Sequence, residues 1–177
     1  MSPSWKALHG QLPESIDPIQ LAERGAQLTG TLPLKSMPRI SQGSLEGSGQ
    51  VNVDLFFERP EGEKIYLMHG VLRAQLRVTC QRCLEPMDLS LEASPWVILV
   101  RSGEQPGQPE GDADILVVDK PISLSALVED ELLLALPMVP MHEPDRCPAG
   151  EYVARVRRTG DEEKNPFAVL SRMKKSR

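Results

Sequence analysis

Residues 70–84, GVLRAQLRVTCQRCL, constrain the fold of this chain more than any other part of the sequence. Strict alternation indicates a β-strand with one buried and one exposed face. The buried row is Leu72, Ala74, Leu76, Val78 and Cys80, and the opposite row is Val71, Arg73, Gln75, Arg77 and Thr79. The strand runs into a turn, Cys80-Gln81-Arg82-Cys83, which brings two thiols together. The sequence therefore predicts a packed strand with a basic stripe on its outer face and a cysteine turn at its end.

The composition favours a single, sheet-rich domain. A chain of 177 residues with 40% hydrophobic content can bury one sizeable core and is short for two full domains. Its 16 prolines and 13 glycines imply many connections between short elements. Two more segments alternate, with expected buried rows at Val51, Val53, Leu55 and Phe57 and at Met87, Leu89, Leu91 and Ala93. Residues 96–100 are apolar on both faces, as in a covered strand.

The best helix candidate covers residues 123–136. Ser123 can cap its N-terminus. On a helical wheel the apolar stripe is Leu124, Leu127, Val128, Leu134 and Ala135. Glu131 falls near the middle of this stripe. It either lies at the edge of the core, where it extends to solvent or pairs with an arginine of the sheet, or it contacts a partner or the cysteine turn. A second, small helix is expected after Asp17, with Pro18 at its first position.

These elements together predict an α+β fold. We expect a curved antiparallel sheet, arranged as a meander and covered by one main amphipathic helix, with a small N-terminal helix and a flexible C-terminal tail. The domain comprises residues 1–150 and the tail residues 151–177. A bulge is expected at His69-Gly70, because an unbroken register would place glycine in the buried row. Residues 137–141, here called the apolar strip, contain two prolines and are expected to pack on the body.

The tail differs in charge from the rest of the chain. From residue 151 onward Lys and Arg outnumber Asp and Glu by eight to four, although the whole chain has a net charge of -5. An acidic body with a basic tail can meet a polyanion locally but does not behave like a protein that coats nucleic acid. Solvated surface charge is the alternative. The segment NPFAVL at 165–170 is expected to dock, and its candidate contacts are Phe167, Leu170, Lys174 and Lys175.

Arg73, Arg77 and Arg82 are candidate contacts for RNA phosphates, because guanidinium groups bind oxyanions in a bidentate way. The alternative is an ordinary solvated strand face whose charges are offset by acidic neighbours. This strand offers no exposed aromatic side chain on which a base could stack, so we do not expect these residues to read bases.

Cys80, Cys83, His142 and Cys147 make a candidate tetrahedral zinc set, if the fold brings their two loops together. The alternatives are a degenerate site or merely two cysteines in a turn. A thioredoxin-like dithiol is not expected, since Leu84-Glu85-Pro86 does not open a helix. No Ser/His/Asp set, paired carboxylates or phosphate-binding glycine loop can be assembled, so we expect a non-enzyme with no cofactor beyond the candidate zinc.

Localisation is inferred from three observations. No apolar run is long enough to span a bilayer, and the start of the chain lacks the apolar core of a secretory signal. Three cysteines, an odd number, suit a reducing compartment. We therefore expect a cytoplasmic protein with no membrane partner and no small-molecule substrate.

Several motifs in their order along the chain resemble the bacterial YceD family of large ribosomal RNA subunit accumulation proteins. They are DPIQLAERGAQLTGTLPLKSMPR, RVTCQRCLEPM, VEDELLLALPMVPMH and NPFAVLSRMK. The resemblance implies a cytoplasmic ribosome biogenesis factor, needed for accumulation or processing of 23S ribosomal RNA, that binds this RNA or a large-subunit assembly intermediate. It implies no catalytic residue. Some relatives carry a second cysteine pair in a zinc-ribbon-like set, whereas this chain has only Cys147 there, with His142 before it.

Two binding hypotheses on the mode of action follow, and a third hypothesis, a thiol enzyme, would require an unusually low pKa at Cys80 or Cys83. In the first, the arginine surface or the basic tail binds precursor ribosomal RNA. In the second, the protein is an adaptor that docks a ribosomal protein or another assembly factor through its apolar helix, the apolar strip or the tail, without touching RNA. The acidic body favours a basic protein as such a partner.

Overall fold

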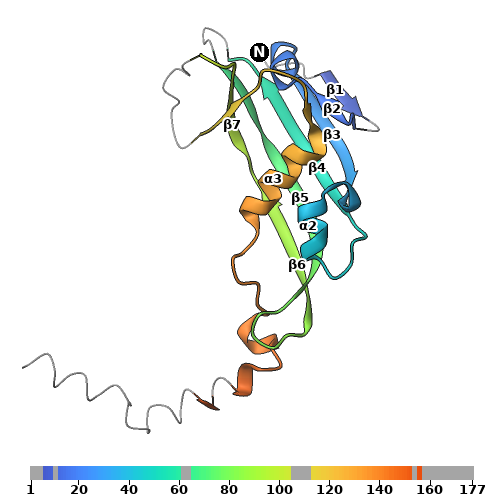
Figure 1. The fold of residues 1–177 in the computed structure, drawn as a ribbon, viewed down its shortest axis with the longest axis vertical. Coiled ribbons are helices and arrows are strands. Elements are labelled where there is room, and N and C mark those ends of the chain that lie inside the picture. Colours follow the sequence, from blue (N-terminus) through green and yellow to red (C-terminus); the bar gives the residue numbers. More distant parts are fainter. Residues whose placement is uncertain (1–5, 10–11, 61–64, 105–112, 153–154, 157–177) are drawn as a thin grey trace, which may run out of the picture.

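The fold is built on a mostly antiparallel β-sheet with helices packed on one face (Figure 1). The structure, a computed structural model, describes residues 6–9, 12–60, 65–104, 113–152 and 155–156. Within these residues it is a mixed α+β fold, as predicted from the sequence. None of the described helices is long and apolar enough to cross a membrane.

In the described part of the chain, the main sheet has seven strands in the order β1-β3-β4-β5-β7-β8, with β6 also paired to β5. Their bounds are β1 Lys6–His9, β3 Ala26–Pro33, β4 Gln50–Glu58, β5 Tyr66–Thr79, β6 Pro86–Ala93, β7 Trp96–Val100 and β8 Asp114–Val117. Each outermost strand is parallel to its neighbour: β1 pairs with β3, and β8 pairs with β7. The other pairs are antiparallel. A separate two-stranded sheet joins β2 (Ser15–Ile16) to β9 (Ile122–Ser123).

The long strand β5 pairs along one side with two strands in succession. Its C-terminal part pairs with β6 and its N-terminal part with β7. The register continues from one to the other, with Ala93 opposite Leu72 and Trp96 opposite His69. Pro95, which has no N–H to donate, lies in the gap between them. β6 and β7 are therefore two halves of one strand, and the cysteine turn lies at the far end of this long hairpin.

The two faces of β5 follow the predicted rows. The row from Leu72 to Cys80 is buried, and Arg73, Gln75 and Arg77 are exposed on the opposite face. The predicted inner row of β4 is buried as well, and it packs in the main core with side chains of α1 and α3. β7 is buried on both faces, because Ile98 and Val100 pack with Leu67 in a second, smaller cluster. Alternation alone thus identified which side of these strands faces the core.

The bulge expected at His69-Gly70 is absent. The β4–β5 ladder is unbroken, and Gly70 lies directly opposite Leu55 in the inner row. A Cβ atom at Gly70 would overlap the carbonyl oxygen of Asp54, and the φ of this glycine is +154°. Here glycine permits a close approach of two backbones within a regular ladder, which is why no extra residue is needed.

The helices are short, and α1, α2 and α3 lie on the inner face of the sheet, where α2 and α3 neighbour each other (Figure 1). Their bounds are α1 Pro18–Glu23, η1 Leu34–Ser36, α2 Pro38–Gly43, α3 Leu124–Ala135 and η2 Pro144–Arg146. The predicted caps are confirmed. Asp17 accepts hydrogen bonds from the N–H groups of Ile19 and Gln20, and Ser123 accepts one from Ala126.

The predicted apolar stripe of α3 is only partly right. Its buried residues are Leu124, Leu127, Val128, Glu129 and Leu132. Leu134 is 77% exposed and Glu131 is half-buried, so the core face is rotated away from both. The face turned toward the sheet and α2 is the one that carries Leu132 and Glu129. A helical wheel could not show this, because leucines lie on several sides of the helix and a neighbouring element decides which of them are covered.

The apolar strip does not pack on the body as expected. Met138 is fully exposed, and Val139 and Met141 are also exposed. The strip is held instead through its backbone, as described below. Of the predicted tail the structure describes only residues 151–152 and 155–156. The docking segment at 165–170 lies outside the described residues, and the division of the chain near residue 150 stays a prediction.

Candidate metal centre

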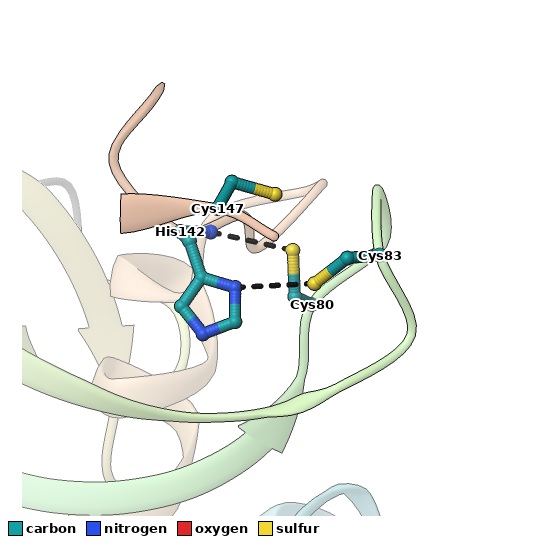
Figure 2. A group of neighbouring side chains, drawn as sticks. All are labelled: Cys80, Cys83, His142 and Cys147. Atoms are coloured by element: carbon teal, nitrogen blue, oxygen red, sulfur yellow. Dashed lines mark hydrogen bonds between the residues drawn. The ribbon is translucent and has the colours of Figure 1, made fainter. Parts of the chain in front are cut away.

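The cysteine turn meets a segment from much later in the chain at one end of the molecule. Cys80 and Cys83 lie between β5 and β6, His142 follows the apolar strip, and Cys147 follows η2. Figure 2 shows the four side chains facing one another. Their ligand atoms all lie within 4.8 Å of one another. The structure therefore joins the four residues that the sequence proposed as a set.

Backbone hydrogen bonds shape the turn around the first cysteine. Cys80 N–H donates to the carbonyl oxygen of Glu85 and Leu84 N–H donates to that of Cys80, both at 2.9 Å. Leu84 takes a positive φ of 62°, which closes the turn. Arg82 N–H points at Cys80 Sγ at 3.5 Å, and His142 N–H, from the other segment, reaches the same sulfur at 3.3 Å. The Cys80 sulfur thus lies among N–H donors from both segments, of which Figure 2 shows the one from His142.

Two further contacts join the segments. Gln81 N–H donates to the carbonyl oxygen of Pro140 at 2.8 Å, which attaches the apolar strip to the turn. Cys83 Sγ lies 3.3 Å from His142 Nδ1. The strip is therefore attached to the same turn that carries Cys80 and Cys83.

The thiols of the turn differ in acidity. Burial acts to raise the pKa of Cys80, but N–H donors from the turn and from His142 outweigh it and lower this pKa to about 5. Burial raises the pKa of Cys83, and the neighbouring thiols of Cys80 and Cys147 raise it further. Cys80 is thus a thiolate at neutral pH, whereas Cys83 keeps its proton until a cation replaces it.

The donor set fits a metal ion. Three sulfurs and one imidazole nitrogen are ligand types that a four-coordinate Zn²⁺ site accepts. All three cysteines are free thiols, and Cys80 and Cys147 are buried. The alternative of two cysteines that merely occupy a turn does not account for the convergence of His142 and Cys147 on them. Within the described chain, the cluster can hold a metal ion.

The arginines of the outer stripe have acidic partners. Arg73 Nε lies 2.8 Å from Glu92, and Arg77 Nη1 lies 3.1 Å from Glu46. Arg82 Nη2 approaches Met141 Sδ of the apolar strip at 3.7 Å. The acidic neighbours considered as an alternative are thus present for the first two arginines, and both pairs are half exposed.

Glu131 makes neither an arginine pair nor a contact with the cysteine turn in the described part of the chain. It lies in a shallow hollow beside Asp114 and Trp96. Burial raises its pKa, and the nearby carboxylates of Asp114 and Asp130 raise it further. Whether Glu131 contacts a partner stays a prediction.

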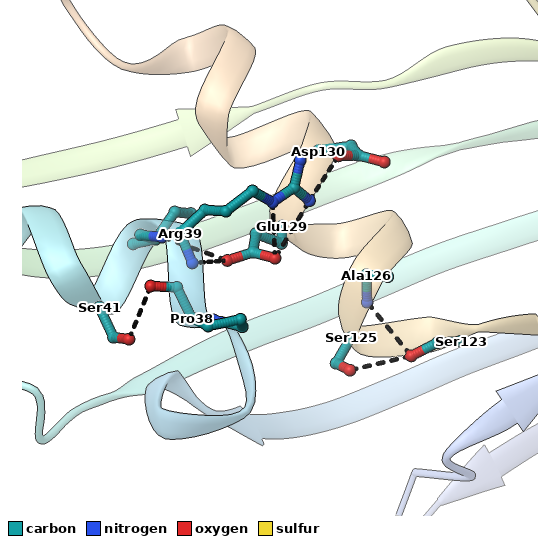
Figure 3. A network of polar contacts seen from close by, with 9 residues as sticks. Pro38, Arg39, Ser41, Ser123, Ser125, Ala126, Glu129 and Asp130 are labelled. Carbon is teal, nitrogen blue, oxygen red and sulfur yellow. Dashed lines mark hydrogen bonds and ion pairs between the residues drawn. The ribbon is translucent and has the colours of Figure 1, made fainter.

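The sequence reasoning missed the carboxylate that is buried. Glu129, 3% exposed, accepts hydrogen bonds from the N–H groups of Arg39 (2.6 Å) and Ile40 (3.1 Å) at the start of α2 (Figure 3). It also pairs with the Arg39 guanidinium at 3.0 Å, and that group extends to Asp130. A signal was available, because Met37-Pro38 opens a helix without a capping side chain and so requires an acceptor from elsewhere.

The sequence patterns also gave no sign of a row of aromatic rings, Phe56, His69 and Trp96, on the outer face of the sheet. His69 stacks on Phe56 of β4 with ring centroids 5.4 Å apart and meets Trp96 of β7 at 5.2 Å. Its Nε2 lies 3.2 Å from Glu58. The strand β5 has no exposed aromatic of the kind that stacks bases, but its neighbours place Phe56 and Trp96 beside it. Cross-strand register, which the sequence does not show directly, creates this row.

Two comparisons with known proteins identify the same protein family. Residues 68–174 match the family model described as "Large ribosomal RNA subunit accumulation protein YceD". The chain is 31% identical over 175 residues to a protein of Haemophilus influenzae with the same name, in an alignment that covers 93% of this chain and 97% of that protein. No solved structure matches the chain.

Proposed function

The chain belongs to the YceD family of large ribosomal RNA subunit accumulation proteins, and from this premise we propose that it is a ribosome biogenesis factor supporting the synthesis, processing or accumulation of 23S ribosomal RNA. It acts in the cytoplasm by binding ribosomal RNA or a large-subunit assembly intermediate, without catalysing a reaction. The observation that supports a binding role is the Cys/His cluster, in which four protein side chains can fill every position of a tetrahedral metal site.

Cys80, Cys83, His142 and Cys147 hold one zinc ion in this proposal. Four protein ligands complete a tetrahedral shell, which leaves no position for a water molecule or a substrate. Such a site is structural. It would join the cysteine turn to the segment that follows the apolar strip, and so support a binding surface rather than a reaction.

A cobalt titration tests the metal. Co²⁺ added to the metal-free protein should bind at one equivalent, with the thiolate charge-transfer and visible bands of a tetrahedral sulfur-rich site, and Zn²⁺ should displace it. Cys83→Ser should weaken or abolish these bands, whereas His9→Ala, a histidine outside the cluster, should leave them unchanged. Bands of octahedral Co²⁺, or the same spectrum in Cys83→Ser, would contradict the site.

The first candidate for the bound component is RNA, contacted by Arg73, Arg77 and Arg82 and by the tail residues Phe167, Leu170, Lys174 and Lys175. The pairs of Arg73 and Arg77 with glutamates are half exposed, so each is worth only about 0–1 kcal/mol and can be exchanged for a phosphate.

The test is binding to 23S ribosomal RNA fragments at several salt concentrations. Arg73→Ala with Arg77→Ala should weaken binding and reduce its salt dependence, because fewer counterions are released. Arg24→Ala with Arg101→Ala removes the same charge elsewhere and serves as the control. Equal effects of the two double variants, or binding that does not depend on salt, would refute an RNA contact at this stripe.

The second candidate is a protein adaptor, and the exposure of Leu84, Met138, Val139 and Met141 supports it. Exposed methionines and leucines beside a rigid turn are typical of protein docking surfaces. Association with large-subunit particles that survives nuclease treatment and is lost in Met138→Asp would favour this candidate over RNA. Release by nuclease would favour RNA.

A further inference from the structure

Within the described residues, part of the backbone of strand β8 has no strand partner. It is the last strand of the main sheet, and among the described residues it pairs only with β7. Val118 N–H donates to the carbonyl oxygen of Val100 at 2.8 Å. In a parallel ladder the N–H and C=O of one residue point to the same side, and successive residues alternate. The backbone groups of Leu116 therefore face β7, and those of Ile115 and Val117 face away from the sheet.

The same two residues expose their side chains. Ile115 is 53% and Val117 is 55% exposed, on the face where Ile98 and Val100 of β7 are buried. Trp96, at the start of β7, is 47% exposed. A sheet edge with open N–H and C=O groups and apolar side chains is a template for an added strand.

Carboxylates mark one end of this edge. Asp114, Glu131 and Glu92 line a shallow hollow of about 330 Å³ together with Trp96. Glu92 already pairs with Arg73, but neither Asp114 nor Glu131 has an ion pair within the described residues. None of the described residues that line the hollow is basic. Carboxylates next to an indole ring suit an ammonium or guanidinium group.

We propose that β8 is a docking edge for an extended basic segment of a partner protein, which adds a strand beside Ile115 and Val117 and places a Lys or Arg side chain in the hollow at Asp114 and Glu131. RNA is disfavoured here because the carboxylates repel phosphates. A second copy of this chain is disfavoured because it would bring the same carboxylates to the same edge. The proposal goes beyond the proposed function and holds whether or not RNA is bound elsewhere.

The purified full chain and a capped peptide of alternating lysine and valine residues test it. The amide resonances of Ile115 and Val117 should shift on titration, and their hydrogen exchange should slow, because both N–H groups gain acceptors. A peptide of alternating glutamate and valine should not bind. Shifts centred on the apolar strip instead, equal binding of the two peptides, or a dimer formed through β8 without peptide would overturn the proposal.

Two pairs of variants separate the backbone and charge contributions. Val117→Pro removes an outward N–H without removing a bond to β7 and should weaken the lysine peptide about tenfold, the value of roughly one hydrogen bond. Val117→Thr keeps the N–H and should bind like wild type. Asp114→Asn with Glu131→Gln should weaken binding and flatten its salt dependence, whereas Glu143→Gln with Asp145→Asn, an equal loss of charge elsewhere, should not. Equal affinities within either pair would refute the corresponding contact, and with it the docking edge.

Discussion

Replacing Glu129 by alanine should destabilise the protein more than any other single carboxylate change among the described residues. The Glu129 side chain is almost fully buried, and it accepts two backbone N–H groups at the start of α2 as well as the Arg39 guanidinium. The variant leaves the Ile40 N–H, at a buried position, without an acceptor. It also removes the buried polar contacts between α2 and α3, while the exposed Arg39–Asp130 pair remains.

The size of the stability loss expected for Glu129→Ala follows from the burial of this carboxylate. A hydrogen bond to a charged group contributes about 1.5–3 kcal/mol, and breaking a buried ion pair by removing one partner costs about 3–5 kcal/mol. The contacts share one carboxylate and are not additive, so we expect Glu129→Ala to cost about 3–5 kcal/mol. For a chain of this size that lowers Tm by about 6–20 °C. Urea unfolding of the metal-loaded protein measures the free energy directly.

Two comparisons make the test specific. Asp130→Ala removes an exposed partner of the same arginine and should cost about 1 kcal/mol or less. Arg39→Ala removes the guanidinium but keeps both backbone N–H donors, so it should cost clearly less than Glu129→Ala if capping of α2 is the main role. A loss below about 1 kcal/mol for Glu129→Ala would refute the reasoning, and equal losses for Glu129→Ala and Arg39→Ala would assign the effect to the ion pair instead.

Three further predictions concern the sheet and the cluster. Gly70→Ala should unfold or severely destabilise the protein, since the added Cβ would meet the Asp54 carbonyl oxygen. Gly43→Ala, where nothing lies within 4 Å of the added Cβ, should leave the stability nearly unchanged. Equal melting curves of the two variants would contradict the clash at Gly70. In the metal-free protein the thiolate absorbance of Cys80 should titrate near pH 5. Because the pKa of Cys80 is depressed, the contribution of its thiolate to stability is complete above the ordinary thiol pKa and is lost as the pH falls toward 5. Titration only near pH 9 would contradict stabilisation of the thiolate by the surrounding N–H donors. Cys147→Ser, or chelation of the wild type, should speed hydrogen exchange of the Gln81 amide that holds the apolar strip, while the core amides of β5 keep their protection; unchanged Gln81 exchange would show that the strip does not depend on the cluster.

Local patterns in the sequence predicted the parts of this protein that depend on near neighbours. Alternation in β4 and β5 identified the buried rows, because a strand turns successive side chains to opposite faces whatever its partners are. Asp17 and Ser123 marked helix starts, because a cap bonds only to residues two or three positions away. The ligand types in the cysteine turn and at His142 and Cys147 indicated a candidate metal site on chemistry alone; the structure brings the four residues together, and metal binding stays a prediction.

Contacts between distant segments had to wait for the tertiary structure. The choice of Glu129 over Glu131 as the buried carboxylate depends on where α2 lies, 90 positions earlier in the chain. The bulge at Gly70 was a wrong prediction because the closeness of β4 is not encoded in β5. The outward N–H groups of Ile115 and Val117 follow from the pairing of β8 with β7. The residue types and their spacing thus determined which groups could cap, pack or bind a metal, but the meeting of those groups is a property of the packed chain, because it depends on free energies summed over many contacts and not on any one segment.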